Sequence, residues 1–133
     1  MPHLLTPQPG KTLEQSYAGL AYTNAQGNAE CVEFIKQTLG APATASWREG
    51  NKIKKGDLSP LAGTAIATFV NGKYPQDGST GKHAAIYLGQ DATGIQVLDQ
   101  WRSQGSVKAR TIKWVPTSPG ASNDGNAFST IEW

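Results

Sequence analysis

The chain has 133 residues, the usual length of one domain, and its 38% hydrophobic and 17% charged composition is that of a folded protein rather than a disordered one. The net charge of +2 and the scattered lysines and arginines exclude the dense cationic stripe of a nucleic-acid-binding protein. We therefore expect a single domain over residues 1–133 that binds no nucleic acid.

The cysteine count and the apolar segments exclude further classes of protein. One cysteine excludes an internal disulfide framework and a zinc site built from several cysteines. No segment approaches the roughly 18 apolar residues of a membrane span, and the first ten residues contain no apolar run of signal-peptide length. We expect a soluble protein that is made in the cytoplasm without a signal peptide and is not inserted in a membrane.

Two helices are predicted in the first third of the chain. A brief helix is expected within Lys11–Leu20, and a polar loop, Ala21–Ala29, leads to a second helix, Glu30–Leu39, with Asn28 as its N-cap. At about 100° per residue, the apolar side chains of the second helix fall on one side, and Cys31 falls among them. The thiol should therefore face the protein from the first turn of this helix.

The rest of the chain is expected to form strands and loops. A loop at 47–50 comes first, and the Gly- and Pro-rich stretches 71–81 and 116–125 are expected to be surface loops. The expected strands are Ala65–Val70, Ala84–Leu88, Ile95–Leu98, Val107–Val115 and Phe128–Trp133. Because no crossover helices separate these strands, we expect an α+β fold in which an antiparallel sheet packs against the helix that carries Cys31.

Cys31 is a candidate nucleophile because of its position at the start of a helix, where the amide dipoles favour a thiolate. A thiol also needs a nearby base, and the chain contains two histidines, His3 and His83. His3 lies close to the N-terminus, whereas His83 opens an apolar strand that should lie in the sheet beneath the helix. We therefore expect His83 to be the base.

A third polar residue should fix the tautomer of the histidine. A short turn at Asp91–Gly94 should place the strand Ile95–Leu98 antiparallel to the strand that His83 opens, so its far end returns beside His83. Asp99 and Gln100 follow that far end. A one-residue slip in the pairing exchanges their faces, so both remain candidates, with Asp99 the first choice and Gln100 the second.

Four short blocks carry a resemblance to known proteins. They are ECVEF at Glu30–Phe34, WREG at Trp47–Gly50, HAAIYLG at His83–Gly89 and VLDQW at Val97–Trp101. In order and spacing they resemble the Cys, His and third-residue blocks of CHAP and NlpC-type cell-wall peptidases and, more closely, of the small type VI secretion amidase effectors. The resemblance implies a papain-like fold in which Cys31, His83 and Asp99 form the catalytic set.

The same resemblance implies what such a protein does and where. It implies hydrolysis of peptidoglycan peptides without a metal or cofactor, at the cross-link between diaminopimelate and D-alanine or, alternatively, at the bond between D-glutamate and diaminopimelate. It also implies delivery by the type VI secretion machinery into the periplasm of a target bacterium. An immunity protein would block the active site in kin cells.

The chain also departs from the patterns of these families. CHAP enzymes commonly carry Glu and Asn where this chain has Asp99, Gln100 and Trp101. NlpC-type enzymes often have a Tyr upstream of the Cys that helps to bind the oxyanion, a position that Tyr22 could match, with the backbone N–H of Cys31 as the other donor. Trp101 is a candidate for lining a substrate groove.

Two other interpretations of the chain remain open. One is a non-catalytic binding or adaptor domain in which Cys31 is a packed structural residue. The other is acyl transfer to an amine rather than to water, which the same residues would support.

Overall fold

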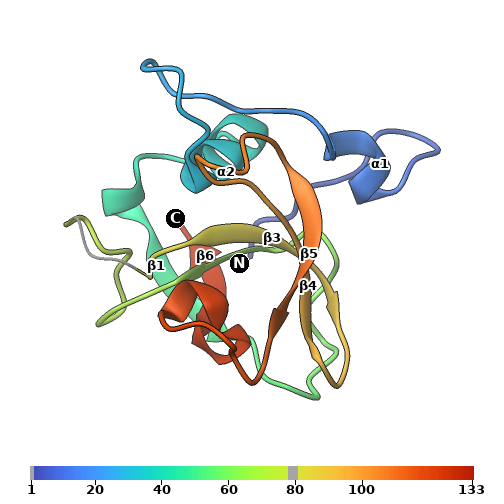
Figure 1. Cartoon of the computed structure of the whole chain (residues 1–133), viewed down its shortest axis with the longest axis vertical. Coiled ribbons are helices and arrows are strands. Elements are labelled where there is room, and N and C mark those ends of the chain that lie inside the picture. The colour runs from blue at the N-terminus through green and yellow to red at the C-terminus, as the bar shows by residue number, and fades with distance from the viewer. Residues whose placement is uncertain (1, 78–80) are drawn as a thin grey trace.

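The computed structural model describes residues 2–77 and 81–133 of the chain as an α+β fold (Figure 1). The two α-helices are α1 (Leu13–Tyr17) and α2 (Cys31–Leu39). The six strands are β1 (Arg48–Lys52), β2 (Ala65–Thr68), β3 (Ala84–Gln90), β4 (Gly94–Asp99), β5 (Lys108–Lys113) and β6 (Phe128–Glu132). The short 3-10 helices are η1 (Thr44–Ser46), η2 (Ala121–Asn123) and η3 (Gly125–Ala127).

The strands form one antiparallel sheet in the order β1-β6-β2-β3-β4-β5. Helix α2 packs against β3 and lies above it in Figure 1. This arrangement confirms the predicted antiparallel sheet with the Cys31 helix on one face. Within the described part of the chain, no helix is long and apolar enough to cross a membrane.

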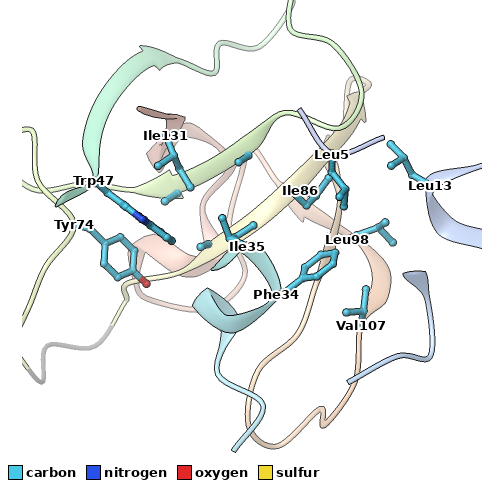
Figure 2. Close-up of a cluster of buried hydrophobic side chains, with 13 residues drawn as sticks. Leu5, Leu13, Phe34, Ile35, Trp47, Tyr74, Ile86, Leu98, Val107 and Ile131 are labelled. Carbon is cyan, nitrogen blue, oxygen red and sulfur yellow. The ribbon is translucent and has the colours of Figure 1, made fainter. Parts of the chain in front are cut away.

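Buried side chains alternate between the two faces of the sheet. The face under α2 carries a group that we call the helix-side cluster, part of which Figure 2 shows. Its buried members are Leu5, Leu13, Phe34, Ile35, Trp47, Ala65, Ala67, Tyr74, Ala84, Ile86, Leu98, Val107 and Ile131. The other face carries the far-side cluster, which consists of Ile53, Ile66, Ala85, Tyr87, Ile95, Val97, Ile112, Trp114 and Phe128. His83, directly before β3, and Asp99, the last residue of β4, lie at one end of the sheet.

The β3–β4 hairpin sets which side chains face each cluster. The turn is closed by the carboxylate of Asp91, which accepts hydrogen bonds from the N–H groups of Thr93 and Gly94 at 2.8 and 3.2 Å. This confirms the predicted turn. The register shifts by one residue between Tyr87 and Gly89, which is a β-bulge that exchanges the faces of every side chain beyond it.

Residues 48–52 form the edge strand β1, so the loop predicted at 47–50 was wrong. Its strand partner is β6, Arg48 also forms an isolated bridge with Lys73, and apart from Gly50 its residues are exposed. A polar edge strand lacks the alternation of apolar and polar residues by which strands are recognised in a sequence. The other predicted helices and strands are present with small shifts at their ends.

The N-cap of α2 is Glu30 rather than the predicted Asn28. Asn28 is held in the preceding loop, because its N–H donates to the side chain of Asn24 at 2.9 Å. Glu30 has an extended backbone (φ −67°, ψ 143°), and α2 begins at the next residue, Cys31. The helix ends at Gly40, whose φ of 65° suits glycine.

Candidate active site

The Cys31 thiol faces the His83 imidazole from the first position of α2. Burial of the thiol disfavours the thiolate, but hydrogen bonding and charge interaction with His83 outweigh burial and lower the pKa of Cys31. The backbone N–H of Ala84 and the hydroxyl of Tyr74 lower the pKa of this thiol further. The surroundings of Cys31 therefore favour its nucleophilic form.

His83 lies directly before β3 and is buried. Its Nε2 is 2.7 Å from Oδ2 of Asp99. Burial disfavours the imidazolium, but the hydrogen bond to Asp99 and the interaction with Cys31 outweigh it and raise the pKa of His83 to about 9. At neutral pH His83 is therefore an imidazolium, whose charge favours the thiolate of Cys31.

Asp99 and Gln100 face opposite sides of the sheet, and the structure brings Asp99 to His83. Gln100 lies on the helix side, where its Nε2 donates to the carbonyl oxygens of Tyr22 and Glu30 at 2.7 and 2.8 Å. Its Oε1 accepts from the N–H of Tyr22 at 3.1 Å. Gln100 therefore fixes the loop that precedes α2 and does not contact the imidazole.

Tyr74 was missed as a site residue, because it lies in the stretch 71–81 that was predicted to be a surface loop. Its side chain is buried and packs edge-on against Trp47, with ring centroids 5.2 Å apart. The hydroxyl lies 3.8 Å from Sγ of Cys31 (Figure 2 shows it at the edge of the helix-side cluster). Burial and the neighbouring Cys31 raise the pKa of Tyr74, so the phenol keeps its proton and can donate.

Tyr22, the predicted oxyanion residue, packs against α2. Its ring stacks on Phe34 with centroids 5.4 Å apart, and burial raises the pKa of its hydroxyl. Among the described residues, the tyrosine hydroxyl that contacts the Cys31 thiol is that of Tyr74. An aromatic residue within an otherwise polar loop was the signal in the sequence that could have indicated Tyr74.

Arg110 is the second residue that the sequence did not indicate. Its Nε and Nη2 each lie 2.8 Å from Oδ2 of Asp99, and Nη2 lies 3.4 Å from Nε2 of His83. Its guanidinium carbon is 4.8 Å from the centre of the Trp101 ring. Arg110 pairs with Val97 across β4 and β5, which places it on the same face as Asp99.

A cleft of 370 Å³ opens beside His83, and the predicted groove residue Trp101 lines it. Its lining residues are Lys82, His83, Trp101, Arg110, Ser122 and Asn123. The cleft connects the buried imidazole with solvent. Within residues 2–77 and 81–133, no three His, Cys, Asp or Glu side chains cluster so as to hold a metal ion.

Comparisons with known proteins identify similar chains. Residues 8–131 match the family described as domesticated amidase effector 2. The type VI secretion amidase effector 2 protein of Salmonella typhi is 45% identical over 73 residues, which cover 55% of this chain and 53% of that protein. The chain thus aligns with about half the length of that relative.

Two further matches cover more of each protein. Domesticated amidase effector 2 of Ixodes scapularis is 36% identical over 106 residues, which cover 77% of this chain and 70% of that protein. A solved structure of type 6 secretion amidase effector 2 (Tae2) superposes with a TM-score of 0.77 and 31% identity, over 94% of this chain and 95% of that one. This match confirms the predicted α+β, papain-like fold.

Proposed function

The chain belongs to the domesticated amidase effector 2 family, as the predicted resemblance to type VI amidase effectors indicated, and we propose that it is a cysteine amidase that hydrolyses peptide bonds of bacterial peptidoglycan. The observation that carries the proposal is the arrangement of Cys31, His83 and Asp99 at the end of the sheet. A nucleophile, a base and a group that orients the base are the parts that covalent amide hydrolysis needs.

The proposed reaction proceeds in two stages. The thiolate of Cys31 attacks the peptide carbonyl carbon, and the C–N bond breaks as the imidazolium of His83 gives its proton to the leaving amine. Water then attacks the thioester while His83 accepts its proton, and the C–S bond breaks to release the carboxylic acid and restore the thiolate of Cys31 beside the imidazolium. Asp99 holds Nε2 of His83 throughout, so that the other ring nitrogen serves Cys31.

The oxyanion of each tetrahedral intermediate would be bound by two donors on the helix side. One is the backbone N–H of Cys31 at the start of α2, where the helix dipole favours negative charge. We assign the second role to the hydroxyl of Tyr74, in place of Tyr22, because it lies 3.8 Å from Sγ and keeps its proton.

The bond that we propose as the substrate is the cross-link between diaminopimelate and D-alanine, with the bond between D-glutamate and diaminopimelate as the alternative. The reaction needs no metal or cofactor, because the thiolate is activated by His83. The same residues would also support acyl transfer to an amine, so the products must be identified as well as counted.

We further propose that the chain is a secreted antibacterial effector that acts in the periplasm of a target bacterium. The support is the name of its Salmonella typhi relative, a type VI secretion amidase effector. Its partners would be the type VI secretion machinery and, in kin cells, an immunity protein that covers Cys31 and the cleft beside His83.

Digestion of purified sacculi tests the enzymatic proposal. The parent protein should release muropeptides whose masses identify the bond that is cut, whereas Cys31→Ala should release none while keeping the circular dichroism spectrum of the parent. Equal digestion by Cys31→Ala would contradict the proposal and favour a binding domain with a structural cysteine.

The rate of thiol alkylation provides an independent readout. Cys31 should react quickly with iodoacetamide near pH 7, and His83→Ala should slow the reaction about tenfold or more, because the thiol loses the partner that lowers its pKa. A thiol that resists alkylation in both proteins would be a packed structural residue.

A further inference from the structure

We propose that the cleft beside His83 is a subsite for a carboxylate of the substrate peptide, bound by Arg110 and Lys82. This inference rests on the proposed function, because the carboxylate would belong to the peptide whose bond Cys31 attacks. The cleft is lined by two permanent cations, and no acidic side chain is among its described lining residues. Its electrostatic character therefore suits an anionic ligand.

Arg110 is held in a fixed orientation with part of its guanidinium left for a ligand. Its Nε and Nη2 are bound to the fully buried Asp99, and its guanidinium carbon lies over the Trp101 ring at 4.8 Å. Nη1 has no hydrogen-bond partner among the residues that the structure describes, and 27% of the side chain is exposed to solvent. The free edge of a preorganised guanidinium matches the planar geometry of a carboxylate.

Lys82 supplies the second charge to the cleft. Its backbone directly precedes His83, and its Nζ donates to the carbonyl oxygen of Asp77 at 2.7 Å, which leaves further donors on the ammonium group. Ser122 adds a neutral hydroxyl to the lining. A ligand carboxylate in this cleft would lie beside the imidazole, on the side of the ring that holds Asp99 and Arg110.

The stem peptides of peptidoglycan carry a free carboxylate near either candidate bond. Diaminopimelate takes part in both bonds and carries a carboxylate on its side chain, and D-glutamate carries a second one. Amidation converts either carboxylate into a neutral group of nearly the same size. It therefore changes the charge of the ligand and little else.

Calorimetric titration of Cys31→Ala, which cannot turn over the ligand, tests the inference directly. The probes are the tetrapeptide L-Ala, D-Glu, diaminopimelate, D-Ala and the same peptide amidated at D-glutamate, at diaminopimelate or at both. Amidation at both positions should weaken binding about three- to tenfold, the range for a partly exposed, charge-assisted contact. The difference should shrink as NaCl rises from about 0.05 to about 0.5 M, because salt screens the interaction.

Variants in the Cys31→Ala background assign the effect to the cleft. Lys82→Gln should weaken binding of the free peptide about threefold and reduce the ratio of affinities between the free and the amidated peptide. Lys82→Arg should retain both the affinity for the free peptide and this ratio. Lys52→Gln, on the distant edge strand β1, is the matched control and should change neither. Equal affinity for free and amidated peptides, or an unchanged advantage in Lys82→Gln, would overturn the inference.

The two experiments can reject the carboxylate subsite and the amidase activity separately. If the parent digests sacculi but Cys31→Ala binds free and amidated peptides equally, the amidase activity stands and the subsite is rejected. If Cys31→Ala shows the selectivity but the parent releases no muropeptide, the subsite stands and hydrolysis is rejected.

Discussion

The two faces of the sheet hold different halves of the candidate active site. On the helix side, Cys31 begins α2, which is anchored by the fully buried Phe34. On the far side, the ring of His83 meets Phe128 edge-on with centroids 6.4 Å apart, and Asp99 binds its Nε2. The proposed nucleophile is thus placed by helix packing, whereas the proposed base is placed by the register of strands.

The side chains of two consecutive residues point to the two opposite faces of the sheet. Asp99 points to the far side and orients His83, whereas Gln100 points to the helix side and fixes the loop before Cys31. Substitutions at the two positions should therefore have different signatures. The first should change the acid–base chemistry of the site, and the second should change the stability of the helix start.

Among substitutions of residues that support Cys31 and His83, Asp99→Asn should have the largest effect, because it removes the charge that stabilises the imidazolium and fixes its tautomer. We expect kcat/KM on a muropeptide to fall about 10²- to 10⁴-fold. The pH profile should change too. In the parent, the imidazolium of His83 is lost as the pH rises through its pKa of about 9, and in Asp99→Asn this loss should occur at a lower pH.

The raised pKa of His83 also makes the free energy of unfolding depend on pH. Because the folded-state pKa of about 9 exceeds the ordinary value of 6.5, the contribution is fully present below pH 6.5 and is lost as the pH rises through about 9. Urea unfolding at several pH values should reveal this loss in the parent and a smaller one in Asp99→Asn. The control Asp57→Asn, in a turn with Ser59, should behave as the parent.

Gln100→Leu should destabilise the protein by about 2–4 kcal/mol, since it leaves three partly buried backbone groups of Tyr22 and Glu30 without partners. The loss should appear in urea unfolding, and Gln26→Leu in the exposed turn of the same loop should cost no more than about 0.5 kcal/mol. The alkaline limb of the activity profile should stay near pH 9, because His83 and Asp99 remain paired. A shift of that limb would contradict the separation of the two faces.

Tyr74→Phe should have the smallest effect, a drop of about tenfold in kcat with little change in KM, because one oxyanion donor is lost while the ring still fills its place. Tyr17→Phe is a matched control. Tyr17 also packs against the helix-side cluster, but its hydroxyl donates to the carbonyl oxygen of Thr6. If the two variants had equal activity, Tyr74 would have only a packing role.

The sequence was sufficient to predict the parts of the site that depend on local pattern. The apolar periodicity of 30–39 placed Cys31 at a helix start, and the turn at Asp91–Gly94 predicted the hairpin that returns Asp99 to His83. The choice between Asp99 and Gln100 depended on a bulge between Tyr87 and Gly89. Without it, Gln100 would share the face of His83, and nothing in the local pattern announces a bulge.

Arg110 and Tyr74 could not be predicted because they reach the site through tertiary contacts. Arg110 depends on the register between β4 and β5, which joins strands separated by a loop. Tyr74 depends on the packing of its loop against Trp47. The polar strand β1 escaped prediction for a related reason, since its pairing with β6 spans most of the chain.

The adjacency of Asp99 and Gln100 has a consequence for thermal motion. The two side chains extend from one peptide unit, so a displacement of this end of β4 is transmitted to the imidazole through Asp99 and to the start of α2 through Gln100. We therefore expect the Cys31 sulfur and the His83 ring to move together, so that the distance between them varies less than the position of either group.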